Sequence, residues 1–542
     1  MKKNSFVEGT VIAAIAILLT KVFGALYVIP FYSIIGENGG VLYSYAYNIY
    51  NLFLNISTAG IPVAVSMIIS EYSSLKKYEA KERAYKISKK VIIIISLISF
   101  LIVFFGSDII GSYFLRGIEG GNKIEDVSLV IKAISFCLLI IPFLSVLRGY
   151  LQGNKYIAAS SVSQVIEQIT RIAIILIGSY LAINVFKTSI PIGVSVALSG
   201  AFFGGLIAYL YLKIKTKKEK NLFKEEEKID NVTNKEIIKK IISYCIPLII
   251  TSIVANLYDL VDMKLIIKGL YMIGYPAKDS ELISSIICTW GPKICMIIIA
   301  VSMGLVTSLI PHIISSYTKN DLDNVNKIFN QAISMILAIT VPMGIGIILL
   351  SEPIYYLFYG ASKYGPLILK YLAVVNVLAG ILSVINNTLQ GVKKFKIIYL
   401  NSIVGLSVNA ILDIPMILFL NKIGIHPFYG TIISTIIGFI ISYIIVFIYL
   451  KKEFKFNYSQ IKTVIKKMII PCLSMIALIV LLDKTILPIK SISYTYSILI
   501  IIVYAILASL LYFVIMYKNN GLYESFGKEY INKILKKLHI QK

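Results

Sequence analysis

Apolar runs long enough to cross a lipid bilayer recur along almost the whole chain, and they constrain its fold more than any other feature. About fourteen such runs, each of roughly 20 residues, lie between Val11 and Tyr517, with no soluble domain between them. Mean hydropathy is +0.82. Charged residues make up only 15% of the chain, whereas soluble domains carry about 25%. The sequence therefore predicts an all-α polytopic membrane protein with about 14 transmembrane helices.

The N-terminus superficially resembles a secretory signal, because Lys2 and Lys3 precede an apolar run. That run extends from about Val11 to Ile35, which is longer than the apolar region of a signal peptide. It also contains Lys21 and has no evident cleavage site between small residues. We therefore expect this segment to be retained as the first transmembrane helix.

The chain has a net charge of +25, and the distribution of its basic residues follows the expected membrane topology. Lysines cluster in alternate loops, and the intervening loops, such as 36–40 and 359–365, are nearly neutral. The basic segments are 76–90, 213–228, 393–396, 451–455 and the C-terminal tail. By the positive-inside rule, the basic side is cytoplasmic, and both termini are expected on the cytoplasmic side of the membrane. We do not expect nucleic-acid binding.

An internal duplication organises the chain. Residues 144–156 (LSVLRGYLQGNKY) match residues 382–394 (LSVINNTLQGVKK) at seven of thirteen positions, at an offset of 238. A second pair, 66–72 and 311–317, is displaced by 245. Each copy holds about six helices, an even number, so the halves form a parallel repeat with the substrate expected between the lobes.

The repeat predicts four segments. These are a first lobe of helices one to six (1–215), a cytoplasmic linker (216–238), a second lobe of helices seven to twelve (239–452), and two further helices with a cytoplasmic tail (453–542).

Lys21 lies in the middle of the first apolar run. About ten apolar or small residues flank it on each side, which corresponds to roughly 15 Å of helix. A lysine stem does not easily reach the interface over that distance. Gly24 and Pro30 weaken the same helix and are candidate hinge residues. We expect Lys21 to line a cavity; the alternative is a lysine that is neutralised by a buried acid or deprotonated.

Lys293 follows a Gly-Pro pair and the chain's single tryptophan, Trp290. If Pro292 begins a helix, Lys293 lies near the outer interface, where tryptophan is common. Residues 281–290 already look helical, however, so Gly291 and Pro292 are candidate hinge residues inside the membrane. We favour the second interpretation, in which Lys293 faces a cavity.

A polar stripe marks the fifth helix. Gln164, Glu167, Gln168 and Arg171 follow the spacing i, i+3, i+4 and i+7, so they share one face that must contact protein or water. We interpret it as a cavity stripe in which Arg171 contacts substrate. Glu167 and Arg171 are alternatively spaced to neutralise each other.

The second repeat carries no charge at the corresponding positions. The offset of 238 places Asn386 opposite Arg148, Gly405 opposite Glu167 and Asn409 opposite Arg171. Arg148 is a further candidate substrate contact, although an arginine at the cytoplasmic end of a helix is ordinary.

Asp259 and Asp262 are candidate coupling residues in the seventh helix, because paired carboxylates can hold a proton or a cation. Lys264 offers the alternative of a plain ion pair, and Asp413 in helix eleven is left unassigned. The five cysteines and three histidines show no metal-ligand spacing. We predict no metal and no cofactor, apart from coupling to the membrane potential or a monovalent cation.

Lysines on helices one and eight place cationic groups in both lobes, which suits an anionic substrate that carries phosphate. The membrane potential, negative inside, favours outward movement of an anion by about 2.3 kcal/mol per charge per 100 mV.

Several segments resemble one family over nearly the whole chain. They are TKVFGALYVIPFY (20–32), NISTAGIPVAVSMIISEY (55–72), LRGYLQG (147–153), SQVIEQITRI (163–172) and SLIPHIISSY (308–317). They resemble the polysaccharide-flippase branch of the MATE-like (MOP) superfamily, especially MurJ and SpoVB-like proteins of Gram-positive type. The two helices after the duplication also resemble MurJ.

The resemblance implies a MATE-type fold and a flippase that moves lipid II, an undecaprenyl-diphosphate-linked peptidoglycan precursor, to the outer leaflet by alternating access. It implies that Lys21 and Lys293 contact the pyrophosphate. Further arginines of the Gram-negative type are absent. Tyr27 stands at one such position, and only Asn51, Asn55 and Ser57 lie near the other.

The implied partners are the lipid-linked anionic substrate, membrane lipids and other cell-wall synthesis proteins. Three alternatives remain open. The chain could flip another polyprenyl-linked polysaccharide unit, including in a sporulation-specific role. It could be a cation-coupled multidrug antiporter, which would normally need an acidic first-lobe cavity. A membrane enzyme, such as a polyprenyl-sugar glycosyltransferase, would need a substantial outer loop, and the outer loops are short.

Overall fold

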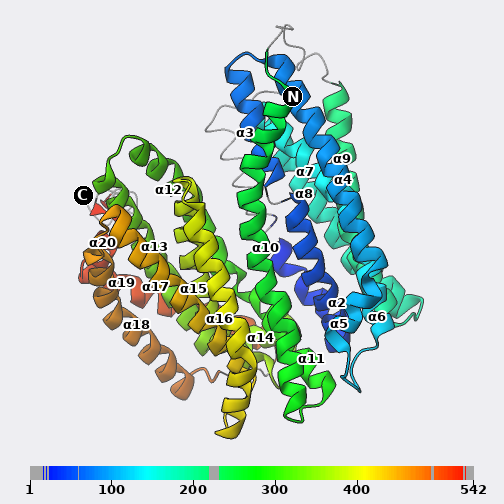
Figure 1. Cartoon of the computed structure of the whole chain (residues 1–542). Coiled ribbons are helices and arrows are strands. Elements are labelled where there is room, and N and C mark those ends of the chain that lie inside the picture. Colours follow the sequence, from blue (N-terminus) through cyan, green and yellow to red (C-terminus); the bar gives the residue numbers. More distant parts are fainter. Residues whose placement is uncertain are drawn as a thin grey trace. The chain divides into compact units, whose positions relative to one another are not determined.

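The computed structural model describes residues 16, 20, 23–58, 60–218, 231–489, 493–528, 531 and 532 (Figure 1). Every regular element in these residues is helical. Twelve of the described helices are long and apolar enough to cross a membrane. These spans confirm the predicted all-α polytopic membrane fold.

The chain forms two compact units, residues 1–285 and 286–542. The first contains α2 (Val28–Thr58), α3 (Ile61–Ser74), α4 (Tyr78–Phe105), α5 (Ser107–Leu115), α6 (Ile124–Ser135), α7 (Cys137–Gly153), α8 (Ile157–Ala173), the π-helices η1 (Ile174–Gly178) and η2 (Leu181–Val185), α9 (Ile190–Lys218), α10 (Asn234–Met272) and α11 (Ala277–Ser285).

The second unit begins with the π-helix η4 (Ile286–Trp290). It continues with α12 (Gly291–Thr318), α13 (Leu322–Leu349), α14 (Ser351–Tyr359), α15 (Gly365–Gly391), α16 (Phe395–Lys422), α17 (Tyr429–Phe454), α18 (Ser459–Thr485), α19 (Tyr494–Lys518) and α20 (Gly521–Phe526).

A sharp break divides α2. Gly36 has φ 64° and ψ −173°, a conformation open to glycine, and it lies inside the neutral loop predicted at residues 36–40. The first transmembrane helix therefore ends before Gly36 and the second begins after it. Together with the twelve spans this agrees with the predicted number of about 14 helices.

The duplication is visible in how paired helices touch. In the first unit a Cβ on Gly204 of α9 would lie 2.7 Å from the Glu167 carbonyl oxygen of α8. In the second unit a Cβ on Gly438 of α17 would lie 2.7 Å from the Gly405 carbonyl oxygen of α16. Gly405 is the predicted counterpart of Glu167, so a glycine approaches the same backbone position in both repeats, although Gly204 and Gly438 are 234 rather than 238 residues apart.

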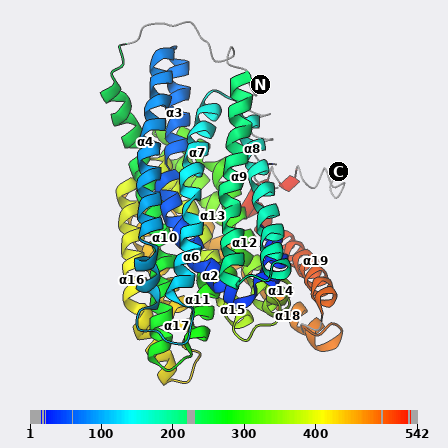
Figure 2. The same cartoon turned by 90° about the vertical axis from the view of Figure 1, so that its right-hand side faces the viewer.

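Helix α10 packs within the first unit, against α2, α3 and α4 (Figures 1 and 2). Gly60 permits this approach, because a Cβ there would lie 2.8 Å from the Cys245 carbonyl oxygen. Lys240 of α10 pairs with Glu71 of α3. The compact unit thus ends beyond the linker predicted at 216–238, and the proposed repeat boundaries stay a prediction. Most of the basic segment 76–90 is the start of α4.

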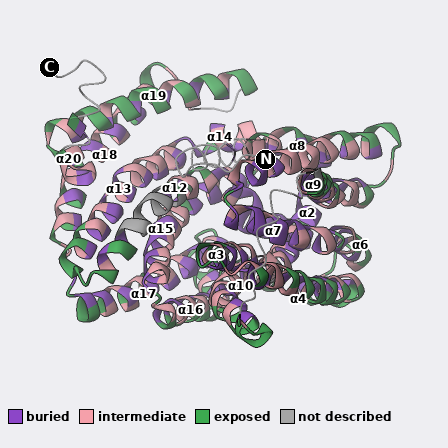
Figure 3. Cartoon of the chain, turned by 90° about the horizontal axis from the view of Figure 1, so that it is seen from above, coloured by how far each residue is buried: buried purple, intermediate pink, exposed green. Residues whose placement is uncertain are grey.

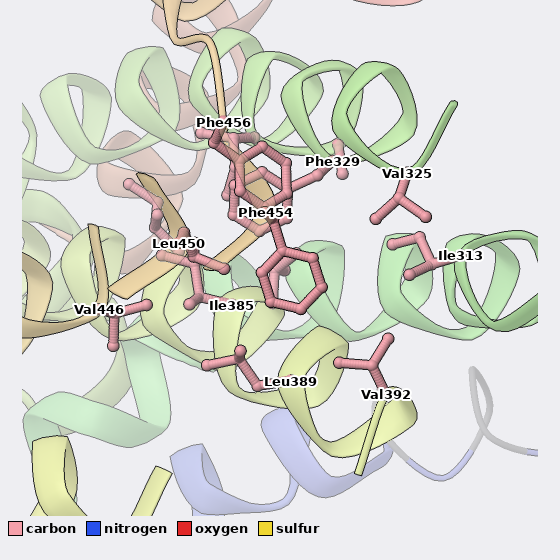
Figure 4. Close-up of a cluster of buried hydrophobic side chains, with 14 of the residues drawn as sticks. Ile313, Val325, Phe329, Ile385, Leu389, Val392, Val446, Leu450, Phe454 and Phe456 are labelled. Atoms are coloured by element: carbon pink, nitrogen blue, oxygen red, sulfur yellow. The ribbon is translucent and has the colours of Figure 1, made fainter. Parts of the chain in front are cut away.

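The second unit has a continuous apolar core between α12, α13, α15 and α17 (Figure 4). Phe329, Ile385 and Val446 are fully buried in it. The two appended helices, α18 and α19, pack on α13, where the Tyr512 hydroxyl donates to the Ala338 carbonyl oxygen at 3.0 Å. Exposed residues follow one side of α4 and α19, as expected for faces that contact lipid (Figure 3).

Candidate functional site

Glu167 is neutralised by an arginine on another helix. Arg148 of α7 places Nη1 2.8 Å from Oε2 of Glu167 on α8, and both side chains are about 85% buried, with exposures of 13% and 15%. Arg148 Nε also donates to the Ser163 hydroxyl at 2.8 Å. The i, i+4 pair of Glu167 with Arg171, which the spacing allowed, is therefore replaced by an ion pair between α7 and α8.

The second repeat keeps this contact in neutral form. Asn401, the counterpart of Ser163, donates its side-chain amide to the Asn386 side-chain oxygen at 3.1 Å. Asn386 is the counterpart of Arg148. Only the first repeat has a charged pair at this position, as the comparison of the two copies predicted.

Four tyrosines lie near Arg171. Its guanidinium lies within electrostatic range of four tyrosine side chains from the first two helices: Tyr27, Tyr43, Tyr47 and Tyr50. The side chain is half-buried. Within the described part of the chain, Arg171 forms no salt bridge. Arg171 is thus a half-buried cation with four tyrosine side chains within electrostatic range.

The tyrosines form a connected group that was not predicted from the sequence. The rings of Tyr43 and Tyr47 stack at 5.4 Å with an interplanar angle of 16°. The hydroxyl oxygens of Tyr27 and Tyr43 are 3.4 Å apart. Tyr43, Tyr47 and Tyr50 follow the spacing i, i+4 and i+7, which places them on one helical face and was the available signal.

The rest of the predicted stripe lies beside the first helix. Gln164 and Gln168 are half-buried, and a Cβ on Gly24 would lie 3.4 Å from Nε2 of Gln168. Lys21 lies outside the described residues. The helix continues past Pro30, because the Phe31 amide donates to the Tyr27 carbonyl oxygen at 3.1 Å. A hinge at Gly24 and Pro30 stays a prediction.

In the second unit, Lys293 lies inside a long apolar span, Ala277–Ser302. It is 9% exposed, and its Nζ lies 4.2 Å from the centroid of the Trp290 ring. Trp290 is fully buried, and its carbonyl oxygen accepts a hydrogen bond from the Tyr359 hydroxyl at 2.8 Å. This burial argues against Trp290 as an interfacial residue facing lipid, the feature that favoured an outer position for Lys293.

The Gly-Pro pair follows a π-helix within this span. The five residues of η4 end at Trp290, and α12 begins at Gly291 with Pro292 in its first turn. A Cβ on Gly291 would lie 2.3 Å from Cδ1 of Leu372 on α15 and 2.9 Å from the Ile286 carbonyl oxygen. Gly291 thus allows the close approach of α12 and α15.

Comparison with known proteins identifies the family. A family described as "Polysaccharide biosynthesis protein" matches residues 6–274, and one described as "MatE" matches residues 247–414. "Lipid II flippase MurJ" of Bacillus subtilis (strain 168) is 29% identical over 464 residues, 84% of each chain. "Stage V sporulation protein B" of the same organism is 23% identical over 67% of this chain and 68% of that protein.

A solved structure, "Lipid II flippase MurJ, inward closed conformation", aligns with a TM-score of 0.65 at 19% identity, over 93% of this chain and 99% of that one. The chain belongs to the MOP superfamily. Within it, the chain is a MurJ- and SpoVB-like member, as the sequence motifs indicated.

Tyr27 is a position at which this chain differs from some relatives in the MOP superfamily. The resemblance implies an arginine in some relatives where this MOP protein has Tyr27. Here the Tyr27 hydroxyl belongs to the tyrosine group around Arg171, which projects from α8. A cation thus reaches this region of the first unit from helix five.

The two aspartates of α10 do not pair with Lys264. The Lys264 ammonium lies 3.2 Å from the centroid of the Tyr113 ring. Among the described residues, no salt bridge joins it to Asp259 or Asp262. Asp262 is buried and Asp259 is exposed. Their role as coupling residues in this MOP protein stays a prediction.

Asp413 lies in a second buried polar group. Its Oδ1 is 3.4 Å from the side-chain nitrogen of Asn409, which also donates to the Thr435 hydroxyl at 3.1 Å. Asp413 and Asn409 are both fully buried. Asn409, which corresponds to Arg171, is therefore part of a buried hydrogen-bonded group in the second repeat.

Proposed function

We propose that this chain is a flippase that moves lipid II, or a closely similar polyprenyl-diphosphate-linked saccharide, from the inner to the outer leaflet. One observation carries the proposal: in the first unit Glu167 is paired with Arg148, and Arg171 is left as a cation among neutral groups. A guanidinium that forms no salt bridge within the described part of the chain can bind phosphate oxygens through charge-assisted hydrogen bonds.

The tyrosine hydroxyls support this role. They can donate hydrogen bonds to a phosphate without adding negative charge, so the region keeps its positive character. Lys293 is a further cation, and it is buried in the second unit. We propose Lys21 as a third, on the basis of the sequence alone.

The relatives agree with this substrate class. Two curated relatives carry the name lipid II flippase in full or as a probable assignment. The relatives named as flippases are transporters rather than enzymes, and this chain is a multi-pass membrane transporter of the same type.

A multidrug antiporter of the same fold is the main competing function. Such a carrier expels organic cations and needs a carboxylate that is available in its first lobe. In the helix-five stripe the carboxylate of Glu167 is paired with Arg148, and the charge of the stripe that forms no salt bridge among the described residues is that of Arg171. The sign of the site therefore favours an anion.

Orientation and coupling belong to the same proposal. We propose that both termini lie in the cytoplasm and that transport proceeds by alternating access while the prenyl tail stays in lipid. The membrane potential then assists export of the diphosphate by about 2.3 kcal/mol per charge per 100 mV. The choice between lipid II and another polyprenyl-linked unit, vegetative or sporulation-specific, depends on the headgroup.

Depletion of the protein in its host tests the proposal. We expect lipid II to accumulate in the inner leaflet, where an impermeant reagent that modifies exposed lipid II cannot reach it. The wild-type chain and Lys21→Arg should restore access, and Lys21→Ala should not. Normal access after depletion, together with new sensitivity to cationic dyes, would instead favour the multidrug function.

A further inference from the structure

The tyrosine group around Arg171 has a composition that phosphate binding does not explain. Phosphate needs cations and hydrogen-bond donors, whereas this region also has four tyrosine side chains within electrostatic range of one guanidinium. Tyr27 and Tyr47 are half-buried, so a bound molecule can reach them. Tyr43 and Tyr50 are each only 2% exposed.

We propose that Tyr27 and Tyr47 form a subsite for the sugar attached directly to the diphosphate, and that they set the specificity for a saccharide-bearing lipid. This inference rests on the proposed function and deepens it. A sugar linked to a phosphate that Arg171 holds must lie within a few bonds of the guanidinium. The tyrosines occupy that neighbourhood.

The chemistry of the rings suits a pyranose. The C–H groups on one face of a sugar carry partial positive charge, and the face of an aromatic ring carries partial negative charge. Phenol hydroxyls both donate and accept, which matches sugar hydroxyl and N-acetyl groups. Neither interaction changes the charge of the site, so sugar recognition is added to phosphate recognition without weakening it.

The structure also holds these rings in place. Tyr47 stacks on the buried Tyr43 at 5.4 Å, and the Tyr43 hydroxyl lies 3.4 Å from that of Tyr27. The buried tyrosine therefore positions both accessible ones. Close helix packing supports the same region, since Gly200 of α9 brings that helix against the Arg171 carbonyl oxygen, 2.9 Å from where a Cβ would lie.

Binding to two lipids separates this subsite from the phosphate site. The full chain in lipid nanodiscs would be titrated with undecaprenyl diphosphate and with the same lipid carrying one N-acetylated amino sugar. We expect Tyr47→Leu to weaken binding of the sugar-bearing lipid by roughly tenfold and to change binding of the sugar-free lipid by less than about twofold. Arg171→Gln should weaken both.

Matched variants keep the test sharp. Tyr47→Phe retains the ring and should lose only about two- to threefold for the sugar-bearing lipid. Tyr180→Leu removes a tyrosine that is 52% exposed on the fifth transmembrane segment and should change neither affinity. Tyr27→Leu provides a second test if Tyr47→Leu does not fold, and it should show the same selectivity for the sugar.

Failure of the inference differs from failure of the proposed function. If Tyr47→Leu and Tyr27→Leu weaken both lipids equally, or neither, the sugar subsite is wrong while the flippase proposal stands. If the wild-type chain binds neither lipid, both proposals are wrong.

Discussion

At the scale of single residues, the arginine that pairs with Glu167 decides which arginine of the first unit can bind an anion. The sequence predicted the polar stripe and its neutral copy in the second repeat. It did not predict the partner of Glu167, because Arg148 lies on a different helix and helical spacing describes only contacts along one helix. The tertiary contact at 2.8 Å pairs Glu167 with Arg148, so Arg171 has no salt bridge among the described residues, as our proposal requires.

Removal of Glu167 tests this assignment. We expect Glu167→Gln to destabilise the protein by about 2 kcal/mol, because it leaves the guanidinium of Arg148 mostly buried without a carboxylate. Thermal unfolding in detergent would measure the loss. Arg148→Met combined with Glu167→Leu should recover most of it.

A surface pair gives the control. Lys394 and Glu453 form a salt bridge at 2.7 Å, with side chains 29% and 46% exposed. Glu453→Gln should cost less than about 1 kcal/mol, since water screens this pair. Equal losses for Glu167→Gln and Glu453→Gln would mean that the buried pair has no special structural role.

At the scale of elements, the eighth transmembrane helix contains a Gly-Pro pair that could be predicted from the sequence and a π-helix that could not. The Gly-Pro pair inside the membrane could be predicted from the helical character of residues 281–290. The π-helix η4 before it could not, because its extra residue per turn is fixed by packing against other helices. The close contact of Gly291 with Leu372 is likewise a long-range effect.

Alanine at Gly291 should therefore destabilise the protein by about 1–3 kcal/mol, because its Cβ would overlap Leu372 and approach the Ile286 carbonyl. Gly304 lies in the same helix, and a Cβ there meets nothing within 4 Å. Gly304→Ala should be neutral or stabilising by up to about 1 kcal/mol. Unfolding midpoints of the two variants would check this, and similar values would contradict it.

The turn between the first two helices holds a carboxyl group that is sensitive to pH. Partial burial, and then the nearby Asp279, raise the pKa of Glu37. A raised pKa means that the folded protein loses stability as pH rises past the ordinary value near 4.3. Glu37→Gln should therefore match wild type near pH 4 and exceed its stability at about pH 7. A constant difference at all pH values would contradict this origin.

At the scale of the whole molecule, the apolar runs and the repeat were enough to predict the fold. About fourteen helices, two similar halves and two appended helices follow from hydropathy and from one short duplicated motif. The packing of α10 within the first unit did not follow, because its contacts with α2, α3 and α4 join segments far apart in sequence. Four of the five cysteines are buried and one is half-buried, which makes the fold suitable for labelling.

Labelling with an impermeant maleimide tests the proposed orientation. A cysteine at Lys422, at the end of α16, should react from outside intact cells, and one at Lys393 should react only after the cells are opened. The opposite pattern would invert the topology and reverse the direction of transport that we propose.

The most direct test of the central claim is transport by the purified chain in sealed vesicles. The measurement is the rate at which lipid II crosses to the other leaflet, for wild type, Arg171→Lys and Arg171→Gln. We predict that Arg171→Lys keeps a substantial rate and that Arg171→Gln loses at least about tenfold, since only the former keeps a cation for the diphosphate. A wild-type rate in Arg171→Gln would contradict the account.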